Sequence, residues 1–118
     1  QIEGGFVQGA GWLTMEEVNW KSNGEITTHS PSTYKIPAVS DMPEKFNVEI
    51  YKYGKNKENT VNKSKTTGEP PLMNAMSVFF AIKDAIASTG NYDKAPIINA
   101  PATPEKILMS IKNLERNL

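Results

Sequence analysis

An acidic residue followed by two prolines constrains the fold of this chain more than any other feature. The stretch reads Gly68-Glu69-Pro70-Pro71-Leu72. Proline fixes its φ angle and carries no N–H, so it suits the first turn of a helix. The apolar residues that follow are Met73, Ala75, Met76, Val78, Phe79, Phe80, Ile82 and Ile86. The pattern predicts a loop that ends at Glu69 and a buried helix over residues 72–87, with Gly90 as its C-terminal cap.

Glu69 stands where this helix is expected to begin. A helix N-terminus has unpaired N–H groups and partial positive charge, which favour a carboxylate held there. A carboxylate on a rigid support, beside an apolar interior, is also what a general base requires. Acidic residues in this place commonly serve only as helix caps, so the residues alone leave both roles open. The catalytic role requires Glu69 to point into a deep cleft rather than into bulk solvent.

The composition excludes several classes of protein. Lys and Arg together balance Asp and Glu at 13 each, so no overall field favours nucleic acid or anionic lipid. The chain has no cysteine, which excludes disulfides, thiolate metal sites and iron–sulfur ligation within it. His29 is the only histidine, so a polar turn position is a better interpretation than a metal ligand. The length of 118 residues suits one domain or a piece of a larger one, and the opening pattern at Gln1 favours a piece.

The remaining pattern predicts an α+β arrangement. Residues 2–15 have helical apolar spacing interrupted by glycines, which indicates a helix whose backbone approaches a neighbour or a ligand. Two β-prone runs flank Asn23-Gly24 and predict a hairpin over residues 18–28. The alternation over residues 46–53 predicts a half-buried strand. Thr103-Pro104 opens a last helix, with Thr103 as N-cap.

The segment from Lys52 to Lys65 contains five lysines and one glutamate, a local net charge of +4. This charge permits contact with phosphate groups, so nucleic-acid binding is one possible function of the segment. The aromatic residues on which single-stranded nucleic acids stack are nearly missing. A solvated loop is the better interpretation, because runs of like charge usually face water.

Several motifs together resemble one family, the molybdenum hydroxylases. The matching segments are Gln1-Ile2-Glu3-Gly4-Gly5-Phe6-Val7-Gln8-Gly9, Pro31-Ser32-Thr33-Tyr34-Lys35-Ile36-Pro37-Ala38, Ser64-Lys65 with Gly68-Glu69-Pro70-Pro71-Leu72, Ser77-Val78-Phe79-Phe80-Ala81-Ile82-Lys83-Asp84-Ala85, and Ala100-Pro101-Ala102-Thr103-Pro104-Glu105. In this order and spacing, residues 1–118 resemble the C-terminal segment of the molybdopterin-binding domain of xanthine dehydrogenases. Gly11-Trp12-Leu13-Thr14 and the short tail look most like the separate molybdenum subunit of bacterial enzymes.

The resemblance assigns roles to three residues. It implies that Glu69 is the catalytic general base, acting on a molybdenum-bound hydroxyl, and that Gln1 and Gly68 bind the molybdenum–molybdopterin cofactor. None of the three is expected to ligate the metal. Aldehyde oxidases usually have Gly-Glu-Ser at this motif, so the Pro70-Pro71 pair favours the xanthine branch. Thr66-Thr67 departs from the Ala-Val that usually precedes Gly68, which loosens the match near the site.

The implied function is hydroxylation of purines, from hypoxanthine or xanthine to urate, by an enzyme of which this chain is a part. Iron–sulfur clusters of the 2Fe-2S type and FAD are expected in other parts of that enzyme. The partners expected are the rest of the molybdopterin-binding domain, the iron–sulfur and FAD domains and a purine, in a cytoplasmic oligomer without nucleic acid or membrane. The alternatives are an aldehyde oxidase-type hydroxylase and a non-catalytic binding or assembly domain on the same scaffold.

Overall fold

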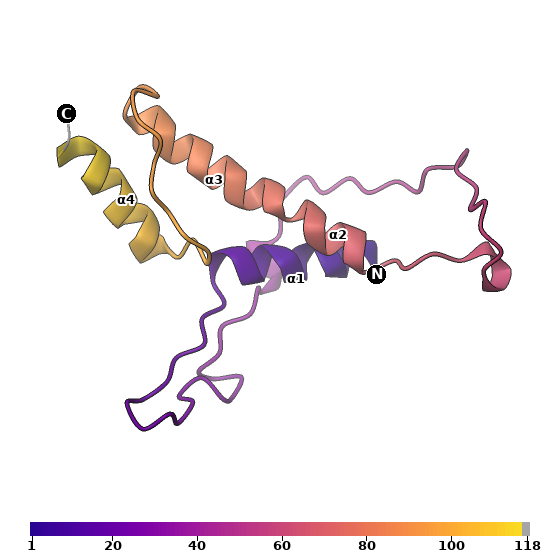
Figure 1. Cartoon of the computed structure of the whole chain (residues 1–118), viewed down its shortest axis with the longest axis horizontal. Coiled ribbons are helices and arrows are strands. Elements are labelled where there is room, and N and C mark those ends of the chain that lie inside the picture. The colour runs from indigo at the N-terminus through magenta and orange to yellow at the C-terminus, as the bar shows by residue number, and fades with distance from the viewer. Residues whose placement is uncertain (117–118) are drawn as a thin grey trace.

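The computed structural model describes residues 1–116, which form a set of helices joined by long extended segments (Figure 1). The four α-helices in this part of the chain are α1 (Ile2–Thr14), α2 (Glu69–Asn74), α3 (Met76–Thr89) and α4 (Pro104–Arg116). Two single-turn 3₁₀ helices, η1 (Val39–Asp41) and η2 (Val61–Lys63), interrupt the long connection between α1 and α2. No helix in this part of the chain combines the length and apolar character that a membrane crossing requires.

The glycines of α1 set how closely it packs against α2. A Cβ added to Gly9 would lie 2.5 Å from the Leu72 carbonyl oxygen and 2.7 Å from the Ala75 Cβ. A Cβ added to Gly5 would lie 2.9 Å from the Gly68 carbonyl oxygen. All three distances are too short for a side chain, so the backbones touch only because these positions are glycine. The predicted glycine-rich helix and its close approach to a neighbour are therefore observed.

The predicted helix over residues 72–87 forms as two consecutive helices, α2 and α3. The first segment, α2, starts at Glu69, and α3 follows after Ala75, whose backbone lies in the helical region. The helix α3 ends at Gly90, which donates a hydrogen bond to the Ala87 carbonyl oxygen at 3.1 Å, as expected for its cap. The predicted burial is only partly observed, because Phe80 remains 59% exposed.

The last helix begins as predicted and is tied to the rest by single hydrogen bonds. The Lys106 N–H donates to Thr103 Oγ1 at 3.4 Å, which is the contact expected of an N-cap. Just before this cap, the Ala102 N–H donates to the Leu13 carbonyl oxygen at the end of α1 at 2.7 Å. Ser110 Oγ, which is buried on α4, donates to the Ile97 carbonyl oxygen at 3.0 Å.

The predicted β-structure is wrong for the described residues, which contain no strand. The expected hairpin is reduced to one antiparallel bridge between Trp20 and Ile26, around a turn at Gly24 with φ +84°. Residues 46–51 have no regular secondary structure, and residues 52–53 form a turn. A strand is stable only when a neighbour accepts and donates its ladder hydrogen bonds, and residues 1–116 offer residues 46–53 no such neighbour. The observed fold is therefore helices with extended connections rather than α+β.

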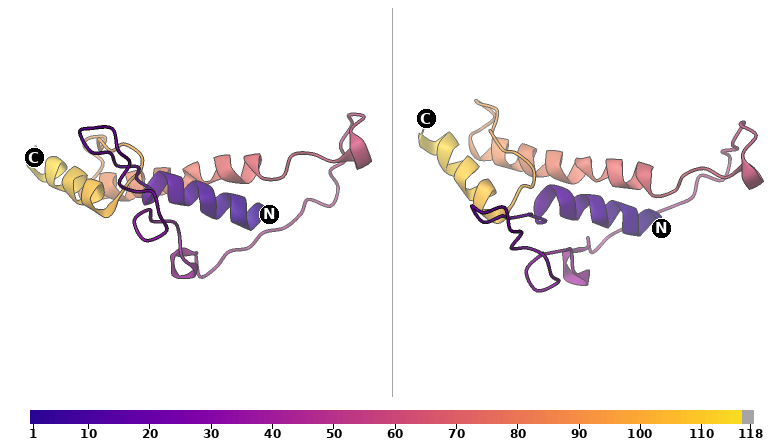
Figure 2. Two further views of the ribbon diagram at one scale, coloured as in Figure 1. Left: turned by 90° about the horizontal axis from the view of Figure 1, so that it is seen from below. Right: turned by 60° about the horizontal axis from the view of Figure 1, so that its bottom comes forward.

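The molecule is expanded for its length. Its Cα radius of gyration is 18.3 Å, against about 13.5 Å for a compact domain of this size. Its accessible surface is 9382 Å², against about 6,300 Å² for a compact protein of this mass. Figures 1 and 2 show the cause, since the loop that carries η2 projects well beyond the N-terminal end of α1. The hydrophobic core of residues 1–116 is small and consists of Ala75, Ile86, Ala102 and Leu114.

Candidate functional site

The three residues predicted for the site lie in one pocket, although the sequence separates them widely. Gln1 precedes α1, while Gly68 and Glu69 form the start of α2. The pocket has a volume of about 510 Å³. Its lining residues are Gln1, Gly4, Gly5, Gln8, Thr66, Gly68, Glu69 and Leu72. The structure thus brings together the N-terminal motif and the Gly-Glu-Pro-Pro motif, while the roles given to these three residues stay predictions.

Helix packing is what places the two motifs side by side. The close backbone contacts of Gly5 with Gly68, and of Gly9 with Leu72, align the first half of α1 with the first turn of α2. The residues that α1 contributes to the pocket follow the i, i+3, i+4, i+7 pattern of one helix face: Gln1, Gly4, Gly5 and Gln8. The floor and one wall of the pocket are therefore set by the α1–α2 contact.

Glu69 is exposed and lines an open pocket, not the deep cleft that a catalytic role was expected to require. Its carboxylate takes part in neither of the two salt bridges found in residues 1–116, which are Lys21–Glu25 and Lys106–Glu17. Pro70 and Pro71 have no N–H, so the first turn of α2 offers fewer free donors than an ordinary helix start. The acid is therefore held by the first turn of α2 without a salt-bridge partner in residues 1–116.

Two polar residues of the pocket were not predicted from the sequence. Gln8 comes from α1, and Thr66 comes from the loop before α2. The spacing of Gln8 from Gln1, seven positions along a predicted helix, was the signal that would have placed it on the same face. Thr66 gave no signal except its departure from the Ala-Val of the resembling family.

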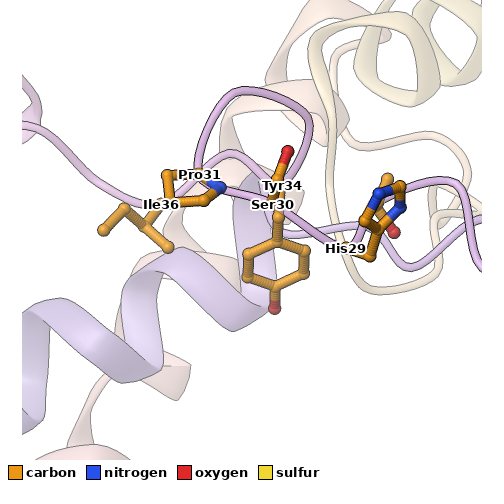
Figure 3. Close-up of a pocket in the computed structure, with 6 residues that line it drawn as sticks. His29, Ser30, Pro31, Tyr34 and Ile36 are labelled. Atoms are coloured by element: carbon orange, nitrogen blue, oxygen red, sulfur yellow. The ribbon is translucent and has the colours of Figure 1, made fainter.

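A second pocket, of about 460 Å³, lies along the loop that follows the Trp20–Ile26 turn (Figure 3). Its lining residues are Thr28, His29, Ser30, Pro31, Tyr34 and Ile36, so it contains none of the predicted site residues. His29 Nδ1 lies 3.2 Å from the Ile26 carbonyl oxygen, which agrees with a polar turn position. No cluster of three or more metal-ligating side chains occurs in the part of the chain that the structure describes.

One ionisable group of this loop has a shifted pKa. The Tyr34 hydroxyl donates a hydrogen bond of 2.5 Å to Glu16 Oε2, just after the end of α1. This hydrogen bond, together with partial desolvation and the charge of Glu16, raises the pKa of Tyr34 above its ordinary value. In Figure 3 the Tyr34 ring lies between His29 and Ile36. The contact fastens residues 30–37 to α1 and is structural.

The basic loop projects into solvent. Residues 51–55 and 57–65 are exposed, including all five lysines between Lys52 and Lys65. Lys63 Nζ donates to the Glu58 carbonyl oxygen at 3.1 Å, a contact within the loop itself. Tyr51 and Tyr53 form an edge-to-face pair with ring centroids 5.8 Å apart. The exposure of this segment fits the interpretation of a solvated loop.

Sequence similarity now identifies the class of this site. Residues 1–43 match the family model of the molybdopterin cofactor-binding domain. Over 113 residues the chain is 50% identical to a xanthine dehydrogenase/oxidase from Felis catus, covering 91% of the chain and 8% of that protein. It is 43% identical over 121 residues to a xanthine dehydrogenase from Oryza sativa subsp. japonica. That alignment covers 93% of the chain and 9% of the relative. A xanthine dehydrogenase from Blastobotrys adeninivorans is 45% identical over 119 residues, an alignment that covers 92% of the chain and 8% of that protein.

Residues 1–43, which contribute Gln1, Gly4, Gly5 and Gln8 to the pocket, are therefore similar to a molybdopterin cofactor-binding domain, as the motifs indicated. More narrowly, the chain is homologous to a segment of the xanthine dehydrogenases, at 43–50% identity to the three relatives named. It spans less than a tenth of the length of these relatives. The likeness to a separate bacterial molybdenum subunit, and the boundaries of the domain, stay predictions.

The chemistry of the pocket fits a pterin. A pterin presents neutral donors and acceptors along its polar edge, and a carboxamide supplies both. Within residues 1–116, the side chains of Gln1 and Gln8 have no hydrogen-bond partner. A Cβ added to Gly4 or Gly68 meets nothing within 4 Å, so both glycines face open space where a ring could approach the backbone. The residues present are therefore suited to hold one part of the cofactor.

Proposed function

We propose that this chain is part of a molybdenum-dependent oxidoreductase that hydroxylates purines, from hypoxanthine or xanthine to urate. The observation that carries the proposal is the shared pocket of Gln1, Gly68 and Glu69. The similarity to xanthine dehydrogenases supports it from the sequence side. The remaining cofactors of such an enzyme, 2Fe-2S clusters and FAD, would lie in other parts of the protein, which we propose to be a cytoplasmic oligomer.

Gln1, Gly68 and Glu69 each have a definite task in this proposal. When bound, the molybdopterin cofactor supplies the redox chemistry of the hydroxylation. Gln1 would hold the polar edge of the cofactor through its carboxamide, and Gly68 would allow the cofactor to approach the backbone closely. Glu69 would accept a proton at its carboxylate, which no cation neutralises within residues 1–116. The α1–α2 contact would fix the distance between the amide and the acid.

The test is the substitution Glu69→Gln in the complete protein that contains this chain. Glutamine keeps the length and shape of the side chain but cannot accept the proton. General base catalysis contributes about 10²–10⁴-fold to rates, so turnover of xanthine should fall by this factor. Molybdenum measured by mass spectrometry should stay at the wild-type level.

Glu3→Gln is the matched control, because Glu3 is exposed on α1 and does not line the pocket. It makes the same chemical change and should leave turnover unchanged. Wild-type turnover by Glu69→Gln with full molybdenum loading would contradict the role given to Glu69. A wild-type protein that lacks molybdenum and pterin would instead favour a non-catalytic assembly domain.

A further inference from the structure

Gln8 is a polar residue of the pocket to which no function has been given. The chain has only two glutamines, and both line this pocket. They stand seven residues apart on one face of α1, which separates them by about 10 Å along the helix axis. The pocket therefore has a carboxamide at each of two points along α1.

The environment of Gln8 argues against a purely structural role. Its side chain is exposed and has no hydrogen-bond partner in the part of the chain described, so it stabilises no loop and caps no helix. The contacts that join α1 to α2 come from Gly5 and Gly9, on either side of it in sequence. Gln8 is thus held by a rigid helix beside a pocket wall while its donors and acceptor stay unused.

The charges of the pocket indicate what Gln8 can bind. Of the eight residues that line it, Glu69 is the only charged side chain, and Lys, Arg and His are missing. A phosphate group would face an acid with no cation to balance it, which is unfavourable. A neutral heterocycle with hydrogen-bonding groups on its edge suits two carboxamides and the Thr66 hydroxyl.

We infer that Gln8 is a second cofactor-binding residue, whose carboxamide hydrogen-bonds the polar edge of the pterin about two helical turns from Gln1. The inference rests on the proposed function, because it takes the bound group to be the molybdopterin cofactor. Gln8 would hold the cofactor and take no part in proton transfer. Its loss should therefore weaken retention of the cofactor more than it changes the chemistry of a loaded molecule.

The test compares cofactor retention in the complete protein with Gln8 intact and with Gln8→Ala. Molybdenum and pterin per chain are measured over time in dilute buffer with a competing chelator. One neutral hydrogen bond corresponds to about a fivefold change in an equilibrium, so Gln8→Ala should lose cofactor about fivefold faster. Glu3→Ala truncates a polar side chain of α1 outside the pocket and should behave as the wild type.

A second variant and a second measurement separate binding from folding. Gln8→Glu keeps the size of the side chain but replaces the amide donors with a carboxylate, so it should lose cofactor at least as fast as Gln8→Ala. The melting temperature of the cofactor-free protein should be equal in all variants. Retention at the wild-type rate in both variants overturns the inference, and so does a matching fall in the cofactor-free melting temperature. A wild-type protein without molybdenum and pterin refutes the proposed function itself.

Discussion

At the scale of single residues, Tyr34 connects the second matching motif to the C-terminal end of α1. Its hydroxyl donates to Glu16, and Pro37 from the same motif packs where Gly11 leaves room for it. A Cβ added to Gly11 would collide with Glu16 Oε1 and with the Pro37 ring. The sequence does not reveal this contact, because Glu16 lies 18 positions away and its proximity depends on how the loop returns to α1.

This contact predicts a pH dependence of stability. The folded-state pKa of Tyr34 is raised, so the protonated hydroxyl contributes stability that is complete below the unfolded pKa of about 10 and is lost as pH rises through the folded value. Tyr34→Phe in the complete protein should lower the melting temperature between pH 7 and pH 9. The difference from the wild type should shrink above pH 10.

Tyr92→Phe is the control for removing a tyrosine hydroxyl. Tyr92 is 61% exposed, and its hydroxyl lies 3.4 Å from Asp84 Oδ2, a much longer contact. Melting curves across the pH series should show little difference between this variant and the wild type. A deficit of Tyr34→Phe that stays constant up to pH 11 would mean that the hydrogen bond to Glu16 is not its source.

At the scale of elements, the contact between α1 and α2 decides whether the pocket exists. The sequence indicated that the glycines of α1 serve close approach, yet it could not say which glycine meets which neighbour. In the structure, Gly5 and Gly9 contact α2, while a Cβ on Gly4 would face open space. Replacing Gly9 or Gly4 by alanine should therefore have opposite effects on stability.

Gly9→Ala should destabilise the complete protein, because the new methyl group would meet the fixed Leu72 carbonyl at 2.5 Å and push α1 from α2. Overpacking of this kind costs about 1–3 kcal/mol. In the cofactor-free protein, Gly4→Ala meets no atom and should stabilise α1 by up to about 1 kcal/mol through helix propensity alone. Denaturant unfolding measures both, and equal stability of the two variants would refute the close packing of α1 on α2.

The elements also show how far sequence reasoning reaches. The helices were predictable because their signals are local: the proline pair before Leu72, the cap at Thr103 and the apolar spacing of residues 2–15. The strand at residues 46–53 failed because alternation predicts a strand's faces but not whether a partner strand is present. Glu69 and Gln1 could be singled out, whereas Gln8 and Thr66 entered the site only through the packing of α1 on α2.

At the scale of the whole molecule, the described residues leave a large apolar surface exposed to solvent. The accessible surface exceeds that of a compact protein of this mass by about 3,000 Å². On α2 and α3, Met73, Met76 and Phe80 remain 55%, 42% and 59% exposed. Since the chain spans less than a tenth of the xanthine dehydrogenases it resembles, the expected cover for this face is the remainder of the same polypeptide.

Phe80 provides the test of that expectation. If the rest of the polypeptide covers this face, Phe80→Ala in the complete protein deletes a buried ring and should cost about 3–5 kcal/mol, seen as a large fall in melting temperature. Were Phe80 as exposed there as it is in this chain, the change would stay within about 0.5 kcal/mol, as for other surface positions. Val61→Ala, at a residue 81% exposed in the projecting loop, should show that small effect.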